Sequence, residues 1–194
     1  MDVGLKKIPI KIIETTAPNG KKAKDIMLDV YDYYEISGNV SEKIHDFKQN
    51  YFAIVKKAIN IMPKNKSKRK PSHFWEIGKS LVDFSKSTEN EFEITNFTQA
   101  VIRDFGLYNR GVVGDTLLFG NNFRREEVSD LVSMSHYREI IQKVNLLRDL
   151  GVFEKEKNRL LMLVKNNNLP THKEYRNQLN KLTEEVKRKP RKAI

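Results

Sequence analysis

The sequence has no cysteine among its 194 residues. This absence excludes disulfide bonds and thiolate metal sites, and it is compatible with a reducing compartment. The sequence also lacks an apolar run of about 18 residues, the length that a membrane-spanning helix needs. Its basic N-terminal stretch contains Pro9 and alternates in hydropathy, unlike a signal peptide. We therefore expect an intracellular, cytoplasmic protein that does not enter a membrane.

Recognisable catalytic chemistry is absent as well. The sequence contains no Gly-rich phosphate loop, nucleophile elbow or HExxH motif. Glu185 and Lys187 are spaced like the end of a nuclease motif, but they lie in a strongly helical stretch rather than on a strand. The four histidines show no metal-ligand spacing: His45, His73, His136 and His172. We accordingly predict no catalytic residue, no metal site and no cofactor.

Positive charge is what the sequence has in excess. The formal net charge is +11 and the isoelectric point is near 9.7. Such an excess favours a polyanionic partner, with nucleic acid as the first choice and an anionic membrane surface as the second. A basic protein that is merely soluble is the alternative interpretation.

The segment 1–62 is predicted to form a small β-hairpin followed by a long helix. Apolar residues alternate on both sides of a turn signal at residues 17–20, although the second arm could equally be helical. Three tyrosines that follow are expected to pack on a core or a partner rather than stack on bases: Tyr31, Tyr33 and Tyr34.

An apolar stripe recurs at helical spacing between residues 41 and 62. Its members are Ile44, Phe47, Tyr51, Ile54, Ala58 and Ile61. A seam of this kind can join two chains in a coiled coil, but additional apolar neighbours widen it, as in a bundle core or a broad dimer face. The stripe is our candidate face for a homodimer.

Residues 63–71 form a basic linker and the best candidate for a domain boundary. The linker has a proline at each end and contains no acid. It could be a solvated connection, but its charge density favours contact with phosphates. Its five basic residues are Lys64, Lys66, Lys68, Arg69 and Lys70. The basic tail, residues 187–194, is expected to add phosphate contacts through Lys187, Arg188 and Arg191.

Residues 72–186 are predicted to form a helical DNA-binding domain. Its first helix begins at Ser72 and includes Trp75 as a core residue. Gly78 lies on the inner face of this helix, where it would let another helix approach closely. A polar loop over residues 85–95 closes the helix, and a short helix is expected over residues 96–105.

A first, lower-ranked helix-turn-helix candidate involves the piece that Asn109 could cap. Glycines at three positions of this piece would each weaken its helix by roughly 1 kcal/mol relative to alanine. If this pair were the DNA reader, three arginines near its ends would serve as contacts: Arg110, Arg124 and Arg125.

The preferred helix-turn-helix candidate spans Glu126 to Leu150. Apolar residues recur at helical spacing over 128–132 and again over 137–150, and Ser135 stands where an N-cap belongs. In such a motif the first turn of the second helix meets base edges in the major groove. The predicted contacts are Ser135, His136, Arg138 and Lys143, with Tyr137 as a buried anchor. An ordinary helical hairpin is the alternative.

Two short motifs resemble a known family. Phe74-Trp75-Glu76-Ile77-Gly78-Lys79 is similar to the Tyr-Trp-Glu-Ile-Gly-Lys of the N-terminal domain of YhcG-type nucleases. Val132-Ser133-Met134-Ser135-His136-Tyr137-Arg138 looks like that domain's Leu-Ser-Trp-Ser-His-Tyr-Arg. The resemblance implies a helical, winged-helix-like DNA-binding domain, here without the family's nuclease domain. The segment from Glu126 is also somewhat similar to the helix-turn-helix of ParB-type partition proteins.

Together these observations predict a mainly α protein with a helix-turn-helix or winged-helix-like bundle and a small N-terminal β-hairpin. We expect a non-enzymatic, nucleoid-associated homodimer that binds double-stranded DNA. Its expected role is that of a transcriptional regulator or a plasmid or chromosome partition factor. The alternative is a protein-interaction subunit that targets a nuclease or another nucleoprotein complex. RNA binding is the third interpretation, because no RNA-module signature supports it.

Overall fold

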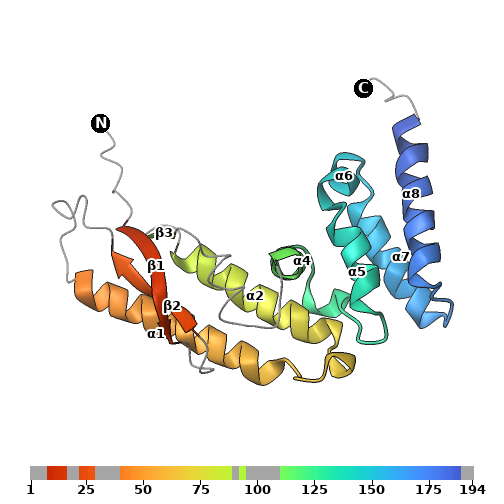
Figure 1. Cartoon of the computed structure of the whole chain (residues 1–194). Helices are drawn as coiled ribbons and strands as arrows, with labels where there is room; N and C mark the ends of the chain where they lie inside the picture. Colours follow the sequence, from red (N-terminus) through yellow and green to blue (C-terminus); the bar gives the residue numbers. More distant parts are fainter. Residues whose placement is uncertain (1–7, 17–21, 29–39, 89–91, 95–109, 189–194) are drawn as a thin grey trace, which may run out of the picture.

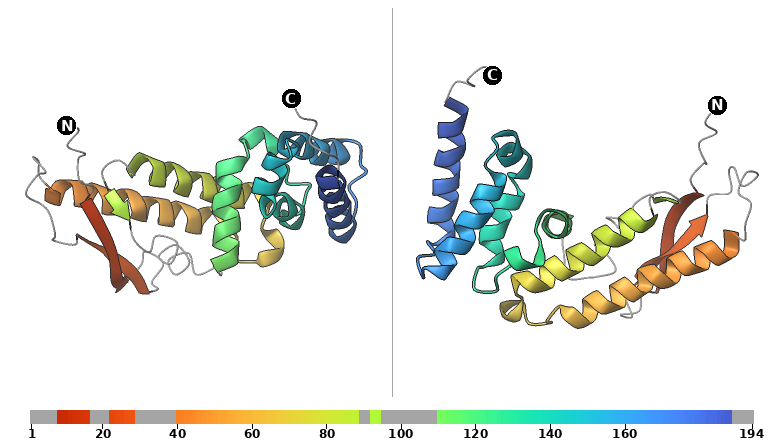
Figure 2. Two further views of the ribbon diagram at one scale, coloured as in Figure 1. Left: turned by 90° about the horizontal axis from the view of Figure 1, so that it is seen from above. Right: turned by 180° about the vertical axis from the view of Figure 1, so that it is seen from behind.

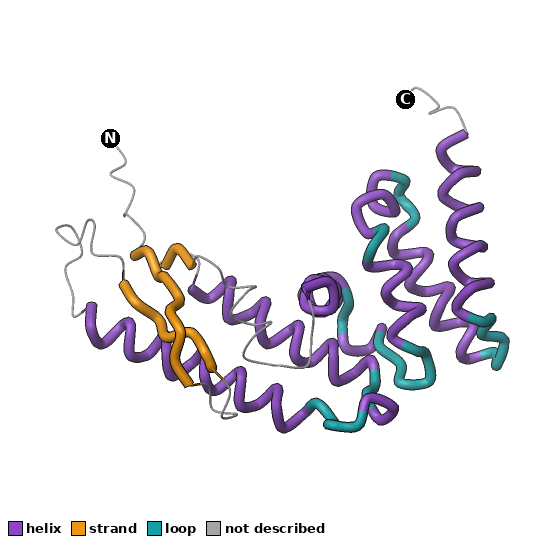
Figure 3. Tube along the Cα trace, in the orientation of Figure 1, coloured by secondary structure: helices purple, strands orange, loops and turns teal. Residues whose placement is uncertain are grey.

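The computed structural model describes residues 8–16, 22–28, 40–88, 92–94 and 110–188. Within these ranges the chain is mainly α-helical, as predicted (Figures 1 and 3). The strands are β1 (Ile8–Thr16), β2 (Lys22–Leu28) and β3 (Phe92–Ile94). The α-helices are α1 (Val40–Ile61), α2 (Pro71–Thr88), α4 (Arg110–Asn122), α5 (Met134–Ile141), α6 (Val144–Asp149), α7 (Phe153–Lys165) and α8 (His172–Arg188). Two short 3₁₀ turns are η2 (Lys66–Lys68) and η3 (Arg125–Glu127).

The described strands form one three-stranded sheet in the order β2-β1-β3. β1 and β2 pair antiparallel, with Ile12 opposite Ile26. Residues 17–21, which would join them, lie outside the described part, so the hairpin itself stays a prediction. The predicted polar loop over residues 85–95 is wrong at both ends. α2 continues to Thr88, and β3 pairs parallel with the start of β1, because its alternating apolar residues suit a strand.

The apolar stripe of α1 packs inside the chain, against α2. Phe47, Tyr51 and Ala58 are buried, and the ring centroids of Phe47 and Phe84 lie 5.0 Å apart. Ile54 and Ile61 are partly buried against the same core, while the side chain of Ile44 lies outside the described part. Aromatic pairs at this separation stabilise a core beyond the area they bury. The stripe is therefore a core element rather than the dimer face that we predicted.

α4 crosses α2 (Figure 2), and Gly78 and Gly120 meet at the crossing. A Cβ added at Gly78 would overlap the carbonyl oxygen of Thr116, and one at Gly120 would overlap the backbone of Gly78. This confirms that Gly78 lets another helix approach closely. From the sequence we expected Gly120 only to weaken its helix. In the structure its lack of a side chain allows α4 to approach α2 closely.

The predicted buried anchor, Tyr137, is confirmed. Its side chain is 1 % exposed and its ring lies 4.8 Å from that of Phe119. The hydroxyl accepts a hydrogen bond from the Ser129 N–H at 2.7 Å and donates to the Glu127 carbonyl at 3.2 Å. Burial is the main reason that the pKa of Tyr137 rises to about 12. The tyrosine thus joins α4, α5 and the chain that connects them.

The predicted helix over residues 128–132 is wrong. This segment follows η3 as turns and bends, and Leu131 is 80 % exposed. Two contacts hold the segment in this shape: the bond from Ser129 to Tyr137, and hydrogen bonds from Ser72 to Asp130. The predicted second helix is also divided, because α5 ends at Ile141 and α6 begins at Val144. Residues 126–150 therefore do not form the helix-turn-helix that we predicted.

Candidate nucleic-acid interface

The basic linker contains an ordered turn, which we call the lysine turn (residues 64–70). The Asn65 side-chain oxygen accepts hydrogen bonds from the Ser67 N–H at 3.0 Å and the Ser67 hydroxyl at 2.8 Å. Arg69 folds back, and its Nε donates to the Pro63 carbonyl at 3.0 Å. The side-chain oxygen of Asn65 thus caps η2 in the way that an N-cap side chain caps a longer helix.

This shape leaves three lysines facing water. Lys64, Lys66 and Lys68 are exposed, and within the described part of the chain their ammonium groups contact no acid. Lys70 is also exposed, but its charge acts on Asp130. Burial would raise the pKa of Asp130, yet hydrogen bonds from Ser72 and the positive charges nearby lower it. Of the five basic linker residues predicted to contact phosphate, Arg69 serves the turn itself and three are unpaired.

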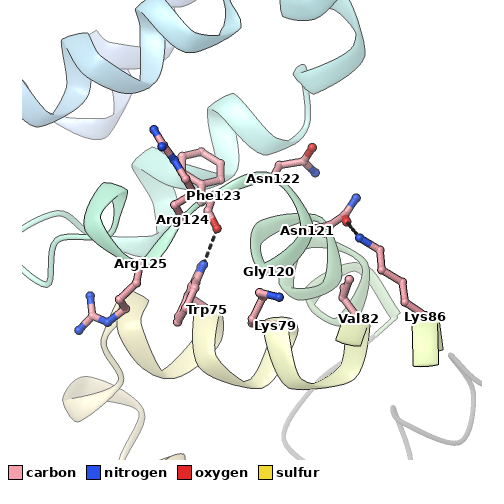
Figure 4. A pocket seen from close by; sticks show the side chains of 10 residues that line it. All are labelled: Trp75, Lys79, Val82, Lys86, Gly120, Asn121, Asn122, Phe123, Arg124 and Arg125. Atoms are coloured by element: carbon pink, nitrogen blue, oxygen red, sulfur yellow. Dashed lines mark hydrogen bonds between the residues drawn. The ribbon is translucent and has the colours of Figure 1, made fainter. Parts of the chain in front are cut away.

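A second basic feature is a pocket of about 390 Å³ between α2 and the end of α4, which we call the cationic pocket (Figure 4). Trp75 forms part of its wall and is held in place because its Nε1–H donates to the Phe123 carbonyl at 2.7 Å. We predicted Trp75 as a core residue, but it is only half-buried. The cations that line the pocket are Lys79, Lys86, Arg124 and Arg125.

The two lysines of the cationic pocket already have partners within the chain. Lys79 forms an ion pair with Asp83 one helical turn away. Lys86 donates to the Asn121 side-chain oxygen at 3.1 Å. Both partners are themselves exposed or at the protein surface, where such contacts are weak and exchange readily with water.

The two arginines of the pocket were predicted as DNA contacts and are both exposed. Arg124 pairs with Glu127 at 3.1 Å, and this hydrogen-bonded contact raises the pKa of its guanidinium. Arg125 donates to the Val128 carbonyl at 3.1 Å and lies 5.9 Å from the centre of the Trp75 ring. From the sequence we used the motif that contains Trp75 and Lys79 only as a resemblance, and we did not propose Lys79 as a contact. We did not propose Lys86 either.

The lysine turn and the two arginines of the cationic pocket are held near the start of α2, and the pocket extends from there along α2 to Lys86. Ser72, in the first turn of α2, donates from its N–H and hydroxyl to Asp130 at 2.9 and 2.8 Å. One turn later, Trp75 holds the carbonyl of Phe123. Two basic segments that are distant in sequence are therefore attached to neighbouring turns of one helix.

The turn predicted to read bases is used inside the protein instead. The N-cap of α5 is Ser133 rather than Ser135. His136 is 6 % exposed, and its ring nitrogens lie 2.7 Å from the Ser133 hydroxyl and 3.0 Å from the Pro170 carbonyl. Ser135 is half-buried. His136 therefore joins α5 to the start of α8 and does not face solvent.

Arg138 and Lys143, the two basic residues predicted as DNA contacts in this region, are also paired. Arg138 Nε lies 2.6 Å from a carboxylate oxygen of Asp115 on α4, and Lys143 Nζ lies 3.6 Å from Glu139. Amphipathic periodicity correctly identified the buried side of α5, but it could not show that α4 and α8 would cover its polar side. The side chains of Arg110, Lys187 and Arg188, and all of Arg191, lie outside the described part.

Two other observations limit the chemistry of the described ranges. No group of three or more histidine, aspartate or glutamate side chains there could hold a metal ion. No helix in those ranges is both long enough and apolar enough to cross a membrane.

No known protein family, curated protein or solved structure matches the chain.

Proposed function

We propose that this protein binds double-stranded DNA, and that the lysine turn supplies phosphate contacts. The observation that carries this proposal is a set of three exposed ammonium groups on an ordered turn that pair with no acid in the described ranges: Lys64, Lys66 and Lys68. A lysine that contacts phosphate releases condensed counterions, which favours binding at low salt. Because the turn is held by Asn65 and Arg69, less backbone freedom is lost on binding than in an unstructured linker.

The cationic pocket extends this surface. Arg124 and Arg125 are exposed and carry planar guanidinium groups that suit phosphate oxygens. The contact of Arg124 with Glu126 lies at the protein surface, where water or phosphate could replace it, whereas Glu127 and Val128 are buried. We propose that the pocket contacts the same DNA backbone next to the lysine turn.

A membrane surface is a weaker interpretation of the same charge. Helices that bind membranes combine lysine or arginine with large apolar residues that enter the interface. The lysine turn contains no apolar residue. Its chemistry fits a polyanion in water better than a lipid surface.

The same proposal includes the winged-helix-like fold that the resemblance to YhcG-type nucleases implies. It also includes the dimer and the role in regulation or partition that we predicted. The protein-interaction alternative has less support. Leu131 and Met162 are exposed, but single exposed apolar side chains are ordinary on protein surfaces.

The test is the salt dependence of binding to a short fluorescent DNA duplex, measured by anisotropy. We compare wild type with Lys66→Gln/Lys68→Gln, which changes the two lysines of η2. The matched control is Lys56→Gln/Lys165→Gln, which removes two equally exposed charges from α1 and α7. Each lost phosphate contact should reduce the magnitude of the log–log salt slope by about 0.9, so we expect a reduction of roughly 1.8.

The control variant should keep the wild-type slope despite carrying the same net charge as the test variant. Equal slopes for both variants would show that only net charge matters and that the lysine turn is not a contact. Binding by wild type that does not change with salt, or no binding at all, would refute the proposed function.

A further inference from the structure

α8 is fixed to the protein along one side only. Tyr175 and Leu179 are fully buried, and Thr183 is nearly so. The Tyr175 hydroxyl donates to Glu156 of α7 at 2.7 Å. α8 stands at the outer edge of the molecule, with α5 and α7 beside it (Figures 1 and 2).

The first turn of α8 is held especially firmly. Thr171 and Glu174 form a reciprocal cap, with the Thr171 N–H donating to Glu174 at 2.8 Å and the Glu174 N–H donating back to the Thr171 hydroxyl at 3.3 Å. Glu139 of α5, which is 2 % exposed, lies 2.7 Å from His172 Nε2 and 2.8 Å from Arg176 Nε. These contacts determine which side of α8 faces the protein.

The opposite side carries what we call the outer stripe: Lys173, Asn177, Asn180 and Lys181. Their spacing of i, i+4, i+7 and i+8 places them on one helical face, turned away from Tyr175 and Leu179. All four are exposed, and their side chains have no hydrogen-bond or ion-pair partner in the described ranges. The acid within this part of the helix, Glu174, is occupied by the cap.

We propose that the outer stripe of α8 lies in the DNA major groove and reads base edges. The inference rests on the proposed DNA binding and names its reading element. An α-helix is about 10–12 Å across, which matches a major groove about 12 Å wide. An asparagine amide can bind adenine N6 and N7 together, and a lysine can bind guanine O6 and N7. The stripe therefore presents two amides and two ammonium groups at positions that a groove-bound helix would use.

Specific reading also needs a rigid element, because a misplaced side chain cannot make paired hydrogen bonds. The cap at Thr171 and the Glu139 contacts supply this rigidity at the end of α8 where the stripe begins.

The experiment selects preferred sequences from a randomised DNA duplex pool. Wild type is compared with Asn177→Ala/Asn180→Ala, and the matched control is Asn145→Ala/Asn158→Ala on the exposed faces of α6 and α7. The duplex that wild type enriches most is then compared with a scrambled duplex by competition, which gives a specificity ratio. Circular dichroism checks that all three proteins are folded.

We expect wild type to enrich a sequence with adenine at one or more positions. The test variant should lose roughly 5- to 150-fold in specificity ratio for each bidentate contact removed, while its affinity for the scrambled duplex stays unchanged. The control variant should keep the wild-type ratio.

Three outcomes would overturn the inference. If wild type binds duplexes but enriches no sequence, DNA binding stands and the reading role fails. If the test variant enriches the same sequence with the same ratio, another element reads the bases. If wild type binds no duplex in the pool, the proposed function and the inference fail together.

Discussion

Replacing Glu139 by glutamine should loosen the attachment of α8 to α5. Glu139 is buried, and its carboxylate contacts His172, Arg176 and Lys143. Glutamine has nearly the same shape but no charge, so the two hydrogen bonds that the carboxylate accepts, from His172 and Arg176, weaken or break. Hydrogen bonds to charged groups are worth about 1.5–3 kcal/mol. The partners are partly exposed, with 35 % and 52 % for the side chains of His172 and Arg176, so water can take over some of their hydrogen bonds.

We therefore expect Glu139→Gln to lower the free energy of unfolding by about 1.5–3 kcal/mol in total. Urea denaturation followed by circular dichroism measures this change. Glu126→Gln is the matched control, because Glu126 is exposed and its pair with Arg124 lies at the surface. Surface pairs contribute about 0–1 kcal/mol. Equal losses in the two variants would refute the reasoning that burial makes the Glu139 contacts strong.

The effect of Glu139→Gln should also depend on pH. Burial opposes ionisation, but hydrogen bonds from Arg176 and His172 outweigh burial and lower the pKa of Glu139 from its ordinary value of 4.5. Its ionised form thus contributes stability that is present above pH 4.5 and is lost as the pH falls through the lowered pKa. The difference between wild type and Glu139→Gln should be present at neutral pH and should shrink below pH 4.5, as the carboxylate becomes protonated. A difference that persists in strong acid would contradict this assignment.

Three further predictions concern the packing of α1, α2 and α4. Gly78→Ala should destabilise the protein by about 1–3 kcal/mol in urea denaturation, because its Cβ would overlap the backbone of Thr116. Gly114→Ala, whose Cβ meets nothing within 4 Å, should instead stabilise α4 by up to about 1 kcal/mol. Phe47→Asp/Ile54→Asp should unfold the α1 and α2 region, as seen by circular dichroism; a folded protein that changes only its sedimentation coefficient would restore the dimer interpretation.

Helical periodicity alone predicted much of the fold. Tyr137 is buried where the stripe of α5 requires it, and Gly78 meets another helix on the face where the sequence places it. These predictions succeed because an apolar stripe must be covered and because a glycine on such a stripe permits close approach. Periodicity could not tell that the stripe of α1 is covered by α2 of the same chain. A core face and a dimer face use the same residues, and only the tertiary fold distinguishes them.

The same limitation explains why the sequence could not show that residues of the predicted reading element make contacts within the protein. Arg138 stands on the polar side of α5, which the sequence cannot distinguish from a solvent-facing side. Asp115, more than twenty residues earlier, lies 2.6 Å from its guanidinium and uses it within the protein. On α8 no described residue covers the outer stripe, although the sequence pattern of α8 resembles that of α5. A base-reading residue needs a polar side chain on an uncovered helix face. Asn177 meets both conditions, whereas Arg138 is polar but lies on a covered face.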